Sequence, residues 1–465
     1  MSFANIIREE IQNNAATYTK LADQVWDFAE IKFDEYQSAH LLASYFEEQG
    51  YRVVREAGGV PTAFTAEFGS GSPVIAVLGE YDALSNLSQE SGLAEPKPLV
   101  KGANGHGCGH NLLGVAGIAS VDSVKALIEA GQLQGTIRYY GCPAEEGGGG
   151  KGFMVRAGLF EDVDAAITWH PGTTNGVVSY RMLATTQHFV TFKGRSSHAA
   201  ASPELGRSAL DAIALVNVGV NYLREHLIDD ARIHYAITNT GGRAANVVQA
   251  EAQALYKLRG PNMEVVKDIY ARFEDIVKGA ALMTDCTYEI GFDSGSSNVL
   301  LNETLEKVMA VAFDELAPPT FNDEEKAYAR AILPTYGGDA FLDQPIDETV
   351  VPYRYDMGVM HGSSDVGDVS WVVPTVQCNT ACYAQHTPFH TWQIVAQGRT
   401  SIAHKGMLYA GEIMGLTLAK VLAQPDVLIQ AKQDLVNVRE GKDYISPFPE
   451  NHPIPVRKQP TAATL

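Results

Sequence analysis

The stretch Gly105-His106-Gly107-Cys108-Gly109-His110-Asn111 lies between a polar loop and an apolar helical segment. Cys108 and His110 are two residues apart, so in an extended segment both side chains point to the same side. The intervening glycines allow the backbone to approach an ion closely. A thiolate with an imidazole suits zinc, and imidazole also accepts other first-row divalent ions. On these residues alone, a metal site and a buried free cysteine beside a capping histidine are equal alternatives.

Three apolar segments around this stretch each lead into side chains that can bind a metal or carry a proton. They are 73–79, followed by Asp82; 135–142, followed by Glu145, Glu146 and four glycines; and 164–169, followed by His170. Continuous apolar runs are typical of buried parallel strands, and open α/β sheets place their sites at the carboxyl ends of such strands. Asp82 alone also fits a turn or helix cap, but the three together favour one metal site built by several loops.

The pattern changes between residues 183 and 297. Segments with strand and helix periodicity follow one another there in the order βαββαβ, which is the ferredoxin-like arrangement. Patterns resembling the first part resume near Leu300. We therefore predict an α/β protein whose catalytic domain, residues 1–182 and 298–465, has a mixed sheet flanked by helices. Residues 183–297 are predicted to form an inserted lid, and its edge strands suit pairing across a homodimer.

The composition narrows the possible partners. The chain has 465 residues, of which 45% are hydrophobic, and a formal net charge of -20. Such acidity argues against nucleic acid and anionic membranes as partners. No secretory signal pattern and no run of about 18 apolar residues is visible, so we expect no membrane span. Five cysteines at irregular spacing indicate a reducing compartment, and we expect a cytoplasmic protein.

Further motifs in the chain carry a family resemblance. They are Tyr81-Asp82-Ala83-Leu84, His106 to His110, Glu145-Glu146, Trp169-His170-Pro171, Ser197-His198-Ala199-Ala200, Asn246-Val247-Val248, Gly367-Asp368 and Phe389-His390-Thr391-Trp392. In this order they resemble the zinc-dependent aminoacylase/carboxypeptidase G metallopeptidases (clan MH, family twenty), in the amidohydrolase branch that carries Cys-Gly-His. The ending 387–398 looks most like the p-aminobenzoyl-glutamate hydrolase subgroup.

The resemblance implies roles for particular residues. The implied ligands of two divalent ions, zinc or manganese, are Cys108, His110, Glu146, His170 and His390. Glu145 matches the general base, and His198 matches a histidine that steadies the oxyanion in a neighbouring subunit's site. The implied substrate-binding residues are Asn246, Arg259 and Gly367, and Asp82 and His106 are implied to support the ligands.

Two positions depart from the pattern of hippurate-type members. Asn111 follows His110 where those members carry Asp, so we expect a different contact there. His386-Thr387-Pro388 resembles their His-x-Pro, which offers His386 as an alternative final ligand. The match through Trp392 favours His390, and His404, inside a helical pattern, is favoured less than either.

The resemblance implies a metal-dependent amidohydrolase that releases a free amino acid from N-acyl conjugates of the p-aminobenzoyl-glutamate type. Such a reaction needs an activated water, a stabilised oxyanion and a protonated leaving amine. The alternative within the same chemistry is a dipeptidase or a broad aminoacylase. A catalytically silent protein that binds acylated amino acids is a rival, but it has no need of the base Glu145.

Overall fold

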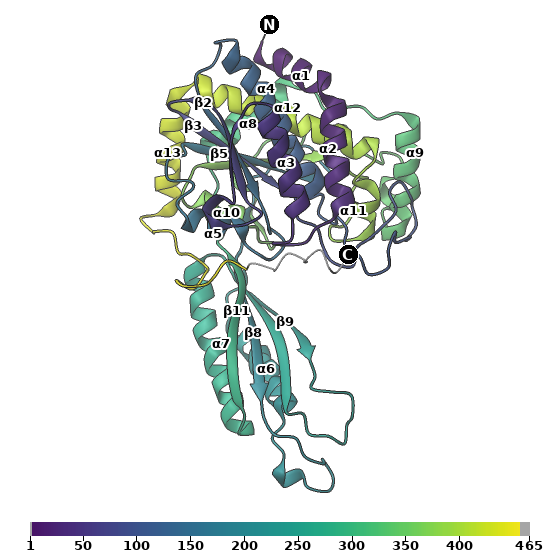
Figure 1. Cartoon of the computed structure of the whole chain (residues 1–465), viewed down its shortest axis with the longest axis vertical. Coiled ribbons are helices and arrows are strands. Elements are labelled where there is room, and N and C mark those ends of the chain that lie inside the picture. Colours follow the sequence, from purple (N-terminus) through teal and green to yellow (C-terminus); the bar gives the residue numbers. More distant parts are fainter. Residues whose placement is uncertain (1, 456–465) are drawn as a thin grey trace.

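A seven-stranded sheet forms the centre of the larger domain in the computed structural model, which describes residues 2–455 (Figure 1). Its strands are β1 (Arg52–Arg55), β2 (Phe64–Ser70), β3 (Val74–Glu80), β4 (Gly135–Cys142), β5 (Ala165–Gly172), β6 (Gly176–Val177) and β13 (Thr375–Ala381). They lie in the order β1-β2-β4-β3-β5-β13-β6. The four central strands, β4, β3, β5 and β13, are parallel, so their carboxyl ends meet at one edge.

Both faces of this sheet are buried, which explains the continuous apolar run of β3. Ile75 and Val77 belong to the core on one face, and Val74, Ala76 and Leu78 to the core on the other. Successive strand residues point to opposite faces, so a strand covered on both sides has no polar positions. The prediction of a buried central strand is confirmed.

The helices of the larger domain supply these two covers. They are α1 (Phe3–Asn13), α2 (Ala15–Phe28), α3 (Tyr36–Glu48), α4 (His110–Glu129), α5 (Gly150–Arg156), α8 (Glu303–Glu315), α9 (Asp323–Ile332), α10 (Val366–Ser370), α11 (Trp392–Gln397), α12 (Ser401–Ala423) and α13 (Pro425–Arg439). Helices α4, α8 and α12 pack on one face, with α1 and α2 outside them. Helices α5 and α10 lie on the other face.

Helices α4 and α12 are long and apolar enough to cross a membrane by length and composition, which the sequence analysis did not expect. Both are largely buried inside the molecule, where they pack against each other and the sheet. A core helix that is covered on most sides carries apolar residues around its whole circumference. Their hydrophobicity is therefore accounted for by the core of this domain.

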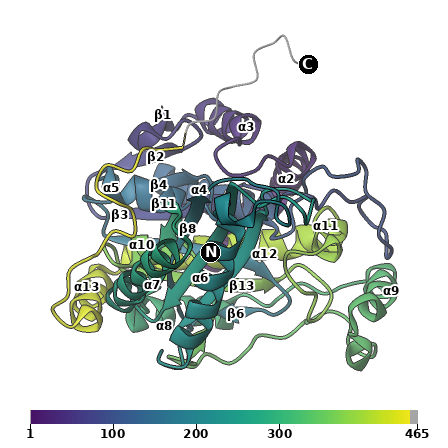
Figure 2. The same ribbon diagram turned by 90° about the horizontal axis from the view of Figure 1, so that it is seen from below.

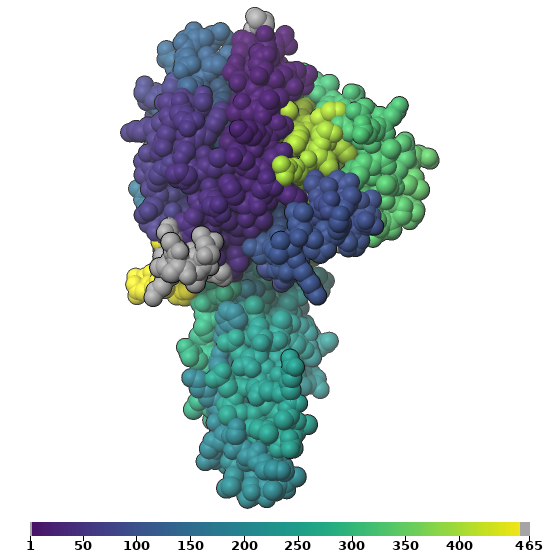
Figure 3. Space-filling model, turned by 45° about the vertical axis from the view of Figure 1, so that its right-hand side comes forward, coloured from purple at the N-terminus to yellow at the C-terminus, as the bar shows by residue number. Residues whose placement is uncertain are grey.

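The inserted segment forms a narrow lid that projects from the larger domain (Figures 1 and 3). It consists of β8 (Ala184–Lys193), α6 (Ala209–Arg224), β9 (Arg232–Asn239), β10 (Glu251–Gly260), α7 (Met263–Thr284) and β11 (Thr287–Ser296). Its sheet has the order β11-β8-β10-β9, and α6 and α7 lie side by side against it (Figure 2). This is the predicted ferredoxin-like arrangement.

The connections between the two parts lie close to the carboxyl edge of the larger sheet. The short parallel pair of β7 (Arg181–Met182) and β12 (Val359–Met360) marks this junction. The tail passes the junction too, because Phe448 packs on Phe153 of α5 and on Phe292 of β11. Residues 444–455 of the tail are irregular. Residues 456–465 lie outside the described residues.

Candidate active site

The carboxyl ends of β3, β4 and β5 bring the predicted residues together. Asp82 follows β3, Glu145 and Glu146 follow β4, and His170 lies near the end of β5. Helix α4 begins at His110, directly after Gly109, whose φ of 80° is a left-handed conformation that suits glycine. The local reversal at Gly109 places Cys108 and His110 at the same edge.

The two glutamates lie in an irregular turn, as the four glycines predict. Ala144 has a φ of 60°, and the backbone N–H of Gly148 and of Gly149 donates to its carbonyl. The backbone N–H of Glu146 donates to Asp82 Oδ2 over 2.7 Å. The turn therefore releases the two carboxylates from the strand alternation that would separate them.

Cys108, His110 and His170 form a first group of candidate metal ligands, with ligand atoms that all lie within 4.8 Å of one another. Nδ1 of His110 lies 2.8 Å from Asp82 Oδ1, and Nδ1 of His170 lies 2.8 Å from the carbonyl oxygen of Pro171. Acceptors at both Nδ1 atoms hold the rings so that Nε2 is the atom available to a metal.

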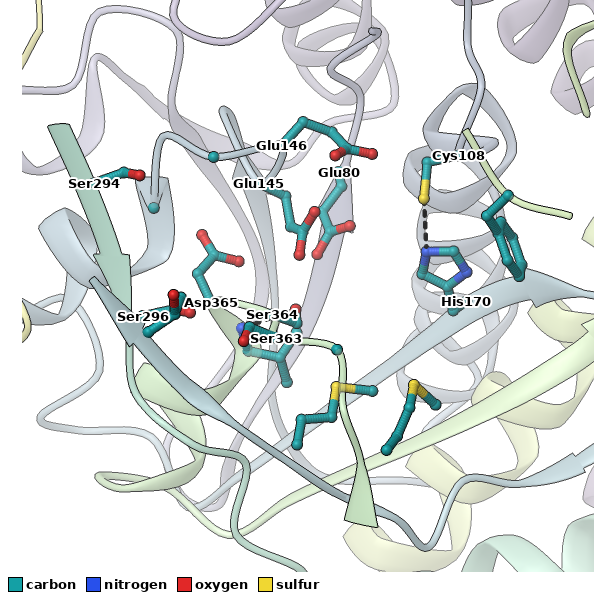
Figure 4. A pocket seen from close by; sticks show the side chains of 18 of the residues that line it. Glu80, Cys108, Glu145, Glu146, His170, Ser294, Ser296, Ser363, Ser364 and Asp365 are labelled. Atoms are coloured by element: carbon teal, nitrogen blue, oxygen red, sulfur yellow. Dashed lines mark hydrogen bonds between the residues drawn. The ribbon is translucent and has the colours of Figure 1, made fainter. Parts of the chain in front are cut away.

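Cys108, Glu146 and His390 form a second such group. Nε2 of His390 lies 3.2 Å from Glu146 Oε1, and its backbone N–H donates to the Gly107 carbonyl. Because Cys108 belongs to both groups, its sulfur lies between two candidate ion positions. Figure 4 shows Glu146 directed toward Cys108, which in turn contacts His170.

The alternative final ligands lie elsewhere. The His386 ring stacks on Phe341 with centroids 4.3 Å apart, and His404 Nε2 lies 2.9 Å from Asp23. Neither belongs to a candidate ligand group. Asn111 Nδ2 donates to the carbonyl groups of Gly398 and Ala22. The geometry therefore favours His390, as the resemblance implied.

Two buried atoms at the centre of these groups make no hydrogen bond of good geometry within residues 2–455: His110 Nε2, which lies 3.3 Å from Glu80 Oε2, and Glu146 Oε1, which lies 3.2 Å from His390 Nε2. Buried polar atoms are normally satisfied, and divalent ions would satisfy both. Burial raises the pKa of the Cys108 thiol, and the Glu146 carboxylate adds to the rise. A cation at this position would instead stabilise the thiolate. The residues present thus fit divalent metal ions.

Glu145 lies among further carboxylates that the sequence analysis did not single out. Figure 4 shows its carboxylate beside that of Glu80, with Asp365 close by. Burial, followed by the charges of Glu80 and Glu146, raises the pKa of Glu145 well above its usual value. A carboxylate with a raised pKa holds a proton more readily, which suits a group that accepts a proton and later returns it.

Glu80 and Asp365 are held by a buried lysine. Lys151 Nζ lies 2.5 Å from Glu80 Oε1 and 2.6 Å from Asp365 Oδ1, and all three side chains are almost fully buried. Burial acts to lower the pKa of Lys151, but Asp365 and Glu80 hold it well above the usual value. The sequence does carry a signal for Lys151, which is its position directly after the glycine run. A helix that starts at the end of a strand there places its first residues at the site.

A cavity of about 400 Å³ extends from these groups to the base of the lid. Its walls include Glu80, Cys108, Glu145, Glu146, His170, Met182, Lys257, Arg259, Met360, Ser363, Asp365, Phe389 and His390. Arg259 Nη1 donates to Ser363 Oγ over 2.6 Å, so this lid residue reaches the larger domain. Lys257 also lines the cavity and belongs to none of the predicted site motifs, although its place two residues before Arg259 on an alternating strand puts both on one face.

The structure leaves four other predicted residues outside this cavity. His198 and Asn246 are exposed in the loops at the far end of the lid. β8 leads from the cavity to that end, and its ten residues span roughly 30 Å at about 3.3 Å per residue. Gly367 is buried, and a Cβ there would meet the Ser297 carbonyl oxygen at 2.0 Å. His106 Nε2 lies 2.9 Å from the Val25 carbonyl, behind the ligand loop.

Residues 76–404 match the family model described as peptidase family M20/M25/M40. The chain belongs to peptidase family M20. Among relatives of this M20 chain, one subunit of the p-aminobenzoyl-glutamate hydrolase of Escherichia coli (strain K12) is 47% identical over 96% of this chain and 97% of the relative. The Xaa-Arg dipeptidase of Mus musculus is 28% identical over 90% of this chain and 89% of the relative.

A solved structure shows the same M20 fold. It is a dinuclear metal-binding peptidase of the M20 family from Bacillus subtilis, with a TM-score of 0.56 and 18% identity, covering 88% of this chain and 99% of that one. Membership of M20 makes this chain a metallo-hydrolase acting on amide bonds. The family and fold implied by the sequence motifs are thereby confirmed.

Proposed function

We propose that this enzyme hydrolyses the amide bond of p-aminobenzoyl-glutamate and similar N-acyl amino acids, releasing the free amino acid. The observation that carries the proposal is the juxtaposition of Glu145 with two ligand groups that share Cys108. The similarity to the Escherichia coli p-aminobenzoyl-glutamate hydrolase chain, which extends over nearly the whole of both chains, supports the choice of substrate.

The residues divide the reaction among them. Two divalent ions, zinc or manganese, would be held by Cys108, His110 and His170 and by Cys108, Glu146 and His390, and would supply Lewis-acid activation of water and carbonyl. Glu145 takes the proton of the attacking water and delivers it to the leaving amine. Asp82 holds His110 in position through Nδ1 and also holds the Glu146 backbone.

The cavity walls support an aromatic acyl group with an anionic amino acid. Met182, Met360 and Phe389 provide apolar surface, and methionine adapts its shape to an aromatic ring. Arg259 at the base of the lid offers a two-pronged hydrogen bond to a carboxylate. Because the chain carries a net charge of -20, an anionic substrate needs such local cations.

We further propose that a second copy of the chain completes the site. β9 is an edge strand of the lid sheet, and its side chains are mostly exposed, including Tyr235 and Ile237. An unpaired edge is suited to pairing with another chain. His198 lies at the far end of the lid, roughly 30 Å from its own chain's cavity at about 3.3 Å per residue. In such a dimer it would reach the partner's cavity and stabilise the oxyanion there.

The direct test measures hydrolysis of p-aminobenzoyl-glutamate by protein loaded with zinc or manganese, together with elemental analysis. We expect two ions per chain and turnover that a chelator abolishes. Full activity of a metal-free protein would contradict the proposal. Release of arginine from Xaa-Arg dipeptides in preference would favour the second candidate, a dipeptidase, which the similarity to the mouse enzyme supports.

A cytoplasmic location is also part of the proposal. All five cysteines are unpaired and buried, which is consistent with a reducing compartment. Cell fractionation with an antibody against the chain would test it.

A further inference from the structure

Two cations project from one strand of the lid into the catalytic cavity. Lys257 and Arg259 lie two residues apart on β10, so their side chains share a face, and both line the cavity. Their Cα atoms are about 7 Å apart, since a strand rises about 3.3–3.4 Å per residue. Both side chains are long enough to converge on a single small ligand between them.

The two cations differ in what they already bind. Arg259 donates to Ser363 Oγ over 2.6 Å. The Lys257 ammonium has neither a hydrogen bond nor an ion pair with any residue among 2–455, although the side chain is only partly exposed. Charges removed from water are normally paired. Burial, and then the neighbouring Arg259, lower the pKa of Lys257 to about 8, so an anion in the cavity would relieve an unfavourable environment.

The nearby carboxylates have other tasks. Glu145 and Glu146 are the acidic groups whose charges act on Lys257, and Lys257 acts in turn on His390. Glu146 is a candidate metal ligand, and Glu145, whose pKa is raised, is the candidate base. Lys257 and Arg259 therefore line the same cavity as the candidate base and the candidate metal ligands. A carboxylate of the substrate would supply the anion that the Lys257 side chain lacks.

We propose that Lys257 binds the side-chain carboxylate of the released amino acid while Arg259 binds its α-carboxylate, so that the preferred substrates are N-acyl dicarboxylic amino acids. This inference rests on the proposed function and adds the residue that selects the amino acid. A guanidinium grips a carboxylate with two parallel hydrogen bonds, whereas an ammonium acts as a point charge. Together the two would recognise both carboxylates of glutamate or aspartate.

The test compares p-aminobenzoyl-glutamate with p-aminobenzoyl-glutamine, which differ only in the side-chain carboxylate. For the unchanged enzyme we expect kcat/KM to favour the glutamate conjugate by roughly 10- to 150-fold, as for one charge-assisted hydrogen bond. Lys257→Met should collapse this ratio toward one, and Lys257→Arg should retain most of it. Lys193→Met removes the same charge from an exposed position on β8 and should leave the ratio as it was.

A second measurement does not depend on turnover. Product inhibition constants for glutamate and glutamine, compared in the same variants, should show the same loss of discrimination in Lys257→Met. An unchanged ratio in Lys257→Met, by either measurement, would overturn the inference, as would an unchanged enzyme that cleaves both conjugates equally. In those cases the proposed function stands, whereas an enzyme that cleaves neither conjugate refutes the proposed function itself.

Discussion

The carboxyl edge of the central sheet and the far end of the lid both carry predicted functional residues, but in opposite environments. At the sheet edge, His110 is fully buried and fixed by Asp82, and Glu146 is held through its backbone. At the end of the lid, His198 and Asn246 are exposed. His198 Nδ1 accepts from the backbone N–H groups of Ala200 and Ala201 of its own loop.

The difference indicates which part of the site a single chain completes. The candidate metal ligands and the base are preorganised within the larger domain, so their geometry does not depend on a partner. The residues at the end of the lid are held by their own loops and face solvent, and the proposed dimer would bring a second surface to them. Substitutions in one half of the site or the other are therefore expected to have separable effects.

The largest effect is expected for Glu145→Gln, which tests the preorganised half. Glutamine has the same shape but does not accept the proton, and general acid–base groups typically contribute about 10²–10⁴-fold. Turnover should fall by that amount while the metal content stays at the wild-type level. Glu146→Gln is the matched control and should lose metal. The opposite pattern would mean that the two glutamates have exchanged roles.

Mixing two inactive variants tests the other half. His198→Ala supplies an intact Glu145, and Glu145→Gln supplies an intact His198, so each mixed dimer would regain one complete site. Random pairing in a symmetric dimer should restore about a quarter of wild-type activity. The measurement is activity after the variants are unfolded and refolded together. Mixed dimers without activity, or an active monomer, would rule out sharing of His198 between chains.

A smaller effect is expected for Arg259→Ala, at the boundary between the two halves. Loss of one charge-assisted hydrogen bond costs about 1.5–3 kcal/mol, or roughly 10- to 150-fold in kcat/KM. The loss should appear for substrates with a free α-carboxylate and should be minor for the corresponding α-amides. Equal losses for both would show that Arg259 supports the lid through Ser363 and does not bind the carboxylate.

The smallest effect is expected for His386→Ala. This exposed ring stacks on Phe341, and surface substitutions usually change stability by less than about 0.5 kcal/mol. Activity and metal content should remain near wild type, whereas His390→Ala should lose one of the two ions. Metal analysis of both purified variants makes the comparison, and loss of metal from His386→Ala instead would reassign the final ligand.

Local patterns in the sequence were sufficient for much of this protein. Strand and helix periodicity located the central strands and the βαββαβ insertion, because side-chain alternation reports burial directly. The spacing of Cys108 and His110, and the carboxylates after β4, identified most candidate ligands, since residues at the ends of neighbouring parallel strands meet at one edge. The family resemblance then implied the role of Glu145 and favoured His390 over His386.

Only the tertiary structure decided which distant side chains meet. His386 and His390 are four residues apart, and the choice between them depends on the hydrogen bond from the His390 backbone to Gly107. The Lys151 cluster joins β3, α5 and the segment before α10, which no local spacing connects. In the sequence, Lys257 resembles an ordinary strand lysine. Its side chain is partly removed from water only because the lid packs on the larger domain. Burial and pairing across long sequence separations are properties of the folded chain, so the sequence alone determined the ligand chemistry, and the fold determined which groups share the cavity.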